Sequence, residues 1–218
     1  MRIVDSSVTL QSITPNSAQL IEEAGRTCYK SEDKITDDSA EKFVEMICKR
    51  GHVSVIEHAG ASFRIVCDRG ISHEIVRHRI ASYSQESTRY CNYSKKKFDN
   101  EISVIRPSQI VPDTEEFEIW RAACRDAELW YFKLIERGVQ PQNARSVLPT
   151  CLKTEIVMTA NLREWTWFME KRLPSAAHPD IRPIAYEIWK VLMEHCPPVF
   201  RRFEDSAAQV VKECILLS

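Results

Sequence analysis

Hydrophobic and polar residues alternate along parts of this chain, and elsewhere they recur with a helical period. Alternation is typical of strands at 2–5, 8–13 and 61–67, and short strands are expected at 102–105 and in the β-branched run 151–159. Helical spacing and end signals predict helices over 15–28, 36–51, 71–81, 115–137, 141–145, 162–172 and 180–195. The polar segment 82–97 is expected to be a long loop. The mixture predicts an α/β or α+β protein with a central sheet flanked by helices.

The length favours one domain, 1–218, because a chain of 218 residues can bury a sizeable core and contains no repeat, low-complexity tract or linker. Its five glycines stand singly and form neither G-x-G-x-x-G nor G-x-x-x-x-G-K-[ST]. The common dinucleotide-binding fingerprint and the Walker loop are therefore excluded.

Eight cysteines are scattered along the chain, at 28, 48, 67, 91, 124, 151, 196 and 214, without a C-x-x-C pair. The first residues do not resemble a signal peptide, and no apolar run approaches 18 residues. We therefore expect reduced thiols in a cytoplasmic protein that does not enter a membrane.

Positive charge is concentrated in the segment 64–97. It holds eight Lys and Arg against three Asp and Glu, a net +5, while the whole chain carries −1 and the remainder therefore −6. A basic region in a nearly neutral protein indicates a local anionic ligand. A solvated basic face is the alternative, especially for Lys95, Lys96 and Lys97.

Helical geometry predicts an unusual environment for Arg79. On a helix over 71–81, Ile71, Ile75, Val76 and Ile80 share one half of the wheel, and Arg79 falls inside that apolar arc. A guanidinium buried there needs a paired anion, unless it extends from the helix end to solvent. The following segment 82–90 combines hydroxyls, Arg89 and backbone donors, which suit a phosphate monoester. These residues predict a phosphorylated small molecule as ligand without identifying it.

Other candidate sites are weaker. His73 and His78 are five residues apart and point in different directions on a helix, so one zinc ion cannot use both, and no metal is predicted. Cys196 lies between a predicted helix and two prolines, and we expect it to have a structural role and not to be a nucleophile. Trp165 and Trp167 are expected to pack, with one of them a candidate for lining a pocket. Tyrosines 83, 90 and 93, interleaved with Ser and Arg, also fit single-stranded nucleic-acid binding.

One long pattern resembles a known family. Arg77-His78-Arg79, then seven residues, Ser87 and Arg89-Tyr90 resemble the signature of the flavin-dependent thymidylate synthases. His52 to His58 is similar to that family's H-x-[ST]-x-x-E-H segment, and 144–149 to its A-R-x-x-L-P segment. Asn161-Leu162-Arg163, followed by Arg172, is similar to its later N-x-R motif and lone arginine.

The resemblance implies an activity and an assembly. Such proteins methylate dUMP to dTMP, with carbon from 5,10-methylenetetrahydrofolate and hydride from NADPH through bound FAD, in homotetramers whose active sites lie at subunit interfaces. It implies the following flavin contacts in this chain: Ser54, Arg77, His78, Arg79, Gln85, Asn161 and Arg163. It implies these dUMP contacts: Glu74, Arg77, Gln85, Glu86, Ser87, Thr88, Arg89, Arg145 and Arg172. His52 would lie beside the flavin and folate, and His52 and Arg172 are the expected catalytic residues.

A catalytic role for Arg172 agrees with elementary chemistry. A fixed cation beside uracil stabilises the anion formed when N3 loses its proton, and that anion makes C5 nucleophilic. Arginine itself cannot be the base. No cysteine nucleophile is then required, in line with the lack of a convincing cysteine site.

The chain departs from the family pattern at three places. Glu74 stands where the family often has Gln, and because a carboxylate repels phosphate we expect it to face the sugar or base. Ser84-Gln85 stands where Asn-Glu is frequent, and Trp167 where a second Asn is frequent. A tryptophan there would stack on adenine or simply pack.

Three other functions stay open at this point. The first is a single-stranded nucleic-acid-binding module, whereas the preferred hypothesis predicts that nucleic acid is not a partner. The second is a non-catalytic, oligomeric nucleotide sensor. The third is a cysteine-dependent thymidylate synthase, for which Cys196 would have to be the nucleophile.

Overall fold

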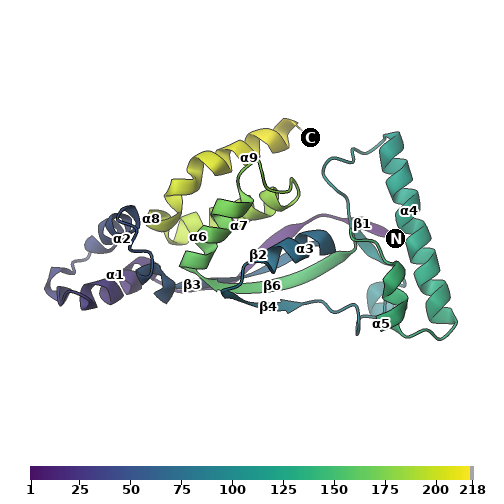
Figure 1. Ribbon diagram of the computed structural model, residues 1–218, viewed down its shortest axis with the longest axis horizontal. Coiled ribbons are helices and arrows are strands. Elements are labelled where there is room, and N and C mark those ends of the chain that lie inside the picture. The colour runs from purple at the N-terminus through teal and green to yellow at the C-terminus, as the bar shows by residue number, and fades with distance from the viewer. Residues whose placement is uncertain (217–218) are drawn as a thin grey trace. The chain divides into compact units, whose positions relative to one another are not determined.

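The strands of the computed structural model, which describes residues 1–216 with the side chains of all but Lys97 and 214–216, form two sheets (Figure 1). β1 (Arg2–Val4) pairs in parallel with β5 (Ser103–Ile105), so that Arg2 lies opposite Ser103 and Val4 opposite Ile105. The larger sheet has the strand order β2-β3-β6-β4, with β2 over Ser7–Ile13, β3 over Gly60–Asp68, β6 over Lys153–Asn161 and β4 over Ala81–Gln85.

Burial along the two inner strands explains why they form. β6 buries alternate residues, Thr154, Ile156, Met158 and Ala160, as a strand with one face in a core requires. β3 follows the same alternation from Ala61 to Cys67. The strands expected at 61–67 and 151–159 are thereby confirmed, with ends shifted by one or two residues.

The chain forms two compact units. Unit 1 comprises Met1–Ser7, Ile65–Arg77 and Ser84–Ile156, and unit 2 comprises Val8–Arg64, His78–Tyr83 and Val157–Ser218.

Unit 1 is built around α4 (Glu115–Glu136), with α3 (Arg69–Ile75), α5 (Pro141–Ala144) and the 3-10 turns η3 (Lys96–Phe98) and η4 (Arg145–Val147). Thr114 caps α4 by accepting a hydrogen bond from the backbone N–H of Phe117 at 3.2 Å, and Gly138 follows the helix with a left-handed φ of 82°. Its core contains Tyr93, Ile102, Val104, Cys124, Tyr131, Ala144 and Leu152.

Unit 2 contains most of the helices. They are α1 (Ser17–Thr27), α2 (Ser39–Lys49), α6 (Leu162–Arg172), α7 (Ile181–His195), α8 (Pro197–Phe200) and α9 (Glu204–Leu216), with the 3-10 turns η1 (Glu32–Lys34), η2 (Val55–His58) and η5 (Arg201–Phe203). α6 packs on α7, and α7 packs on α8 and α9 (Figure 1). The fully buried Trp165 of α6 donates from Nε1 to the carbonyl of Ala61 at 3.1 Å and meets Phe63 edge to face. This contact fixes α6 against β3.

One expected element is wrong. The helix predicted over 71–81 ends at Ile75, and the segment predicted to begin a loop at 82 starts instead with β4. Backbone pairing explains the difference, because the N–H of Glu86, directly after β4, donates to the carbonyl of Glu155 in β6 at 2.8 Å. Sheet pairing in the folded protein has overridden the local helical period.

This correction removes the buried arc inferred for Arg79. Ile80 is 71% exposed, Val76 is 38% exposed, and Arg79 is itself exposed. The argument that Arg79 needs a buried anion is therefore wrong, because a solvated guanidinium requires no partner. The C-terminal elements α8, η5 and α9 were not expected either.

Two searches of the described residues bear on possible partners. Up to residue 216, no helix combines the length and the apolar character needed to cross a bilayer. In the same part of the chain, no three or more His, Cys, Asp or Glu side chains cluster as a metal would require.

Candidate active site

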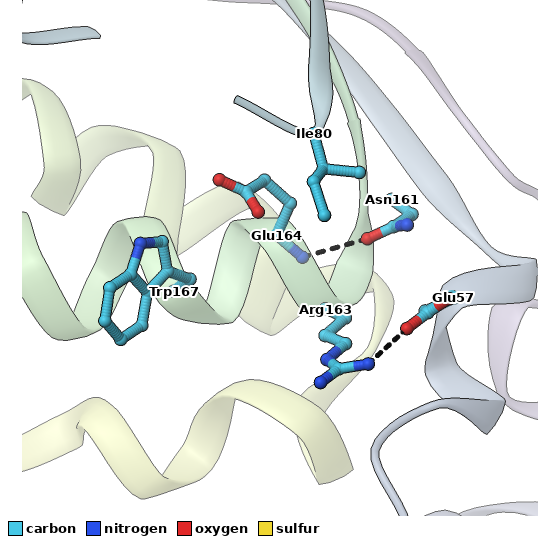
Figure 2. A pocket seen from close by; sticks show the side chains of 6 residues that line it. All are labelled: Glu57, Ile80, Asn161, Arg163, Glu164 and Trp167. Atoms are coloured by element: carbon cyan, nitrogen blue, oxygen red, sulfur yellow. Dashed lines mark hydrogen bonds and ion pairs between the residues drawn. The ribbon is translucent and has the colours of Figure 1, made fainter. Parts of the chain in front are cut away.

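A cavity of about 340 Å³ lies at the start of α6 in unit 2 (Figure 2), and we call it the α6 cavity. It is lined by Glu57, Ile80, Asn161, Arg163, Glu164 and Trp167. Asn161 caps the helix, because its Oδ1 accepts a hydrogen bond from the N–H of Glu164 at 2.9 Å. Arg163 and Trp167 are four residues apart and so share one face of α6, where Arg163 pairs with Glu57. The cavity thus presents an amide, a half-exposed indole, one cation that is already paired with Glu57, and a second carboxyl group, that of Glu164.

A buried histidine lies in the same unit. The side chain of His78 is 3% exposed, and its ring packs 4.7 Å from that of Phe168. Nε of Arg172 donates to Nε2 of His78 at 3.2 Å. Nδ1 lies 3.4 Å from Oε1 of Glu164 but has no hydrogen-bond partner among the described residues. Burial, with Arg172 nearby, lowers the pKa of His78 to about 4, so the ring is neutral at pH 7.

Two neighbours respond to the same environment. Burial raises the pKa of Glu164 from its ordinary value, although Arg163 opposes the shift. Burial, helped by Glu164, raises the pKa of Tyr83 to about 12, and the Tyr83 hydroxyl donates to the carbonyl of His78. Despite the short distance, His78 and Glu164 are therefore not an ion pair at neutral pH, because burial outweighs their attraction.

Unit 1 contains a second cavity, of about 400 Å³, which we call the Arg145 cavity. Its polar lining includes Arg69, His73, Thr88, Arg145 and Ser146, and no carboxylate is among its described lining residues. Nη1 of Arg145 donates to Oγ1 of Thr88 at 2.9 Å, and Nε of Arg145 donates to the carbonyl of Gln142 at 3.1 Å. Two guanidiniums and a hydroxyl facing one hollow form a suitable site for an anion.

The remaining predicted dUMP residues of unit 1 lie in several environments. The Gln85 amide donates to Ser72 at 2.8 Å and to Thr154 at 3.2 Å, so it is held inside the unit. Glu86 forms an ion pair with Lys153 at 3.2 Å. Arg89 is exposed and donates to Gln142 at 3.0 Å. Glu74 and Ser87 are half-buried, and Arg77 is exposed.

A third cavity, of about 740 Å³, lies in unit 2 and contains both His52 and Ser54 in its lining. The structure thus brings Asn161 together with Arg163, Thr88 with Arg145, and His52 with Ser54, in three separate cavities. His78 and Arg172 contact each other, while Arg79 is an exposed residue of unit 2.

Some lining residues were not predicted. Arg69 and His73 belong to the basic segment but match no part of the signature. A local signal beside them is Asp68, which caps the start of α3 because its Oδ1 accepts a hydrogen bond from the N–H of Ile71 at 2.7 Å. Of the two tryptophans, one of which was expected to be a candidate for lining a pocket, Trp167 lines the α6 cavity and Trp165 is in the core.

The cysteines whose side chains are described are all thiols, as expected, while the side chain of Cys214 lies outside the described residues. Burial raises the pKa of both Cys67 and Cys196 to about 12. A nucleophile must reach its substrate as a thiolate, so the fully buried Cys196 is unsuited to that role.

Comparison with known proteins places this arrangement in context. Residues 9–198 match the family model described as thymidylate synthase complementing protein. The flavin-dependent thymidylate synthase of Pyrococcus furiosus is 37% identical over 178 residues, covering 81% of this chain and 71% of its own. That of Geobacter sulfurreducens is 33% identical over 204 residues, covering 89% and 85%.

A solved structure is also similar. The UMP/dUMP methylase PolB from Streptomyces cacaoi, crystallised with 5-Br dUMP, superposes with a TM-score of 0.77 over 94% of this chain and 97% of that one. At 18% identity this likeness speaks for the fold, and it confirms the mixed α/β class.

Proposed function

The chain belongs to the family of thymidylate synthase complementing proteins, and from this premise we propose that it is a flavin-dependent thymidylate synthase. It converts dUMP to dTMP, with 5,10-methylenetetrahydrofolate as carbon donor and NADPH as reductant. The observation that carries the proposal is the match to relatives of that name over four-fifths or more of the chain. The active form is a cytoplasmic homotetramer.

The residues of unit 2 suit FAD. Trp167 offers an aromatic face, the exposed Arg79 offers charge to a diphosphate, and Arg163 offers guanidinium donors beyond the one that pairs with Glu57. The Asn161 side chain and Ser54 offer polar contacts. When bound, FAD supplies the route by which the hydride of NADPH reaches the carbon being transferred. His78 is too buried to present its ring to a large ligand, so it supports the site by holding Arg172.

The Arg145 cavity suits the phosphate of dUMP. Arg69 and Arg145 supply positive charge, and Thr88 supplies a hydroxyl. Because its described lining carries no carboxylate, a phosphate dianion meets attraction there and no repulsion. Arg89 lies exposed close along the chain and can extend this positive field.

Arg172 supplies the chemistry at the base. A guanidinium beside the pyrimidine stabilises the N3 anion and so raises electron density at C5, which attacks the methylene carbon of the folate. The neutral imidazole of His78 orients Arg172 by accepting from Nε without cancelling its charge. His52 lies in the cavity beside Ser54, where it is suited to contact the folate.

The visible spectrum of the purified protein is the first test. We expect a yellow protein with flavin absorption, which oxidises NADPH when dUMP is present. It should form dTMP only when methylenetetrahydrofolate is present as well. A colourless protein that binds no added FAD would overturn the proposal. Competition separates the alternatives: dUMP should saturate the protein and an oligonucleotide should not, whereas a nucleic-acid-binding module would show the reverse. A nucleotide sensor would bind dUMP without turnover.

A further inference from the structure

Apart from His52 and Ser54, the residues that line the 740 Å³ cavity of unit 2 have no part in the proposed chemistry. This cavity is formed by α1, the segment that follows, α2 and the loop to Val55, and we call it the α1–α2 cavity. Three of its lining residues are cations, Arg26, Lys34 and Arg50, and no Asp or Glu is among its described lining residues. It is about twice the volume of either other cavity.

The three cations have different surroundings. Arg26 is already compensated, because it pairs at 2.7 Å with the buried Glu22 and its guanidinium lies 4.7 Å from the centre of the Phe43 ring. Lys34 and Arg50 are exposed, and neither forms an ion pair with a described residue. Arg26 is thus part of the wall, while Lys34 and Arg50 are available to an anion.

The floor of the cavity is apolar. Phe43, Met46, Ile47 and Val55 line it. Gly25 lets α1 approach α2 closely, since a Cβ there would lie 2.6 Å from the Phe43 ring. The exposed ring of Tyr29 adds an aromatic wall. An apolar floor with cations at two positions suits a ligand that has an aromatic stem and an anionic end.

The turn after α2 sets where Arg50 and His52 stand. Gly51 has a left-handed φ of 75°, and the N–H of His52 donates to the carbonyl of Ile47 at 3.0 Å. This is the way a glycine commonly ends a helix, and it places Arg50 and His52 on either side of one fixed turn. The exposed cation Arg50 and His52, the residue expected beside the folate, therefore line the same cavity.

We propose that the α1–α2 cavity binds the p-aminobenzoyl-glutamate tail of the folate co-substrate, with Lys34 and Arg50 pairing with the glutamate carboxylates. The inference rests on the proposed function, which makes a folate the ligand next to His52. The benzoyl ring packs on the apolar floor, and each added glutamate brings a carboxylate toward the two cations. The cavity thereby selects folates with a longer glutamate chain.

The test compares tetrahydrofolate carrying one glutamate with tetrahydrofolate carrying five, by titration calorimetry on the FAD-loaded protein. We expect the longer tail to bind about ten-fold more tightly, equivalent to about 1.4 kcal/mol. In the double variant Lys34→Gln/Arg50→Gln this ratio should fall close to one. Raising the salt concentration should reduce it in the unchanged protein, because exposed charges are screened.

Two further variants guard against a trivial result. Lys49→Gln removes an exposed cation of α2 that pairs with Glu45 at 3.0 Å and does not line the cavity, so the ratio should be unchanged. Lys34→Arg/Arg50→Lys keeps both charges and should retain the preference. A preference for five glutamates that survives in the double Gln variant would overturn the proposal. It would also be overturned if the double Gln variant lost affinity for NADPH alone and bound both folates as the unchanged protein does.

Failure of the two proposals can be told apart, because the titration needs no turnover. A protein that forms dTMP but ignores glutamate number contradicts the tail site alone. A protein that prefers the longer tail through Lys34 and Arg50 but forms no dTMP contradicts the catalytic proposal alone.

Discussion

Nε of Arg172 donates a hydrogen bond to Nε2 of His78 across 3.2 Å, so the last residue of α6 is tied to a buried, neutral imidazole. Because Nε2 is the acceptor, the ring proton resides on Nδ1, on the side of Glu164. The neutral ring of His78 therefore contacts a cation within the chain, while the direct flavin contact that the motif implied stays a prediction.

Replacing Arg172 should affect chemistry far more than folding. In Arg172→Ala, dTMP formation should fall by about 10²–10³-fold, as when one preorganised electrostatic group is removed. The free energy of unfolding should fall by only about 1 kcal/mol for the lost hydrogen bond to His78. Steady-state kinetics and urea denaturation measure the two effects, and a variant with near-normal turnover would contradict the assigned role.

The buried His78 should make stability depend on pH. In the unfolded chain this residue takes up a proton below pH 6.5, whereas in the folded protein its pKa is about 4. Above pH 6.5 the histidine is neutral in both states and does not lower the free energy of unfolding. As the pH falls from 6.5 toward 4, protonation of the unfolded chain lowers the free energy of unfolding by about 3 kcal/mol in total.

The variant His78→Gln isolates this contribution, because a neutral amide can still accept from Arg172. Urea denaturation at pH 7, 6, 5 and 4 should show a shallower loss of stability in the variant than in the unchanged protein. Parallel curves for the two proteins would mean that His78 titrates normally.

Asn161 should have separable structural and ligand roles. Asn161→Ala removes the cap on α6 and should cost about 1 kcal/mol of stability. Asn161→Asp keeps the acceptor for the N–H of Glu164 and should preserve stability, but it adds negative charge to the α6 cavity and should weaken FAD binding by about ten-fold or more. Thermal denaturation and flavin titration distinguish these outcomes, and equal FAD affinity in all three proteins would remove Asn161 from the flavin site.

The two tryptophans of α6 should respond in opposite ways. Trp165→Phe loses the hydrogen bond to Ala61 and part of the packing with Phe63, and should cost about 2 kcal/mol or more. Trp167→Phe, at a residue that is 46% exposed, should change stability by about 0.5 kcal/mol or less. If Trp167 contacts FAD, this second variant should release flavin more readily, as equilibrium dialysis can show.

Cys196 should be dispensable for turnover. Its thiol is fully buried and burial raises its pKa to about 12, so only about one molecule in 10⁵ carries a thiolate at pH 7. Cys196→Ala should form dTMP within about twofold of the unchanged protein, with a modest loss of stability from the small void. Abolished turnover in a folded variant would revive a cysteine-dependent mechanism.

Local sequence signals were sufficient to predict an element whose formation is determined by its own residues. The period of two found β3, and the capping pattern and Gly138 marked both ends of α4. They failed at 76–85, because the pairing of β4 is decided by a strand about 70 residues further along the chain. They also do not predict α8, which begins at Pro197 just after the helix predicted over 180–195, although proline is well suited to the first turn of a helix.

The candidate site shows the same division. The motifs identified Asn161, Arg163, Thr88 and Arg145, and these residues do line cavities. They could not reveal that His78 is buried, because its burial comes from Phe168 and Arg172, which lie on a helix distant in sequence. The two exposed cations of the α1–α2 cavity were equally hidden, since Lys34 and Arg50 come to line one cavity only after α1 and α2 have packed.

The eleven residues of α6 join two chemically distinct ends. Asn161 and Arg163 stand at its start and Arg172 closes it, so the rise of the helix holds Arg172 about 16 Å from Asn161 and about 14 Å from Arg163 along its axis. Inserting or deleting one residue within α6 would turn Arg172 by about 100° and break its alignment with His78. Side chains on this helix can be exchanged one at a time, but its length cannot change without separating the guanidinium from its imidazole.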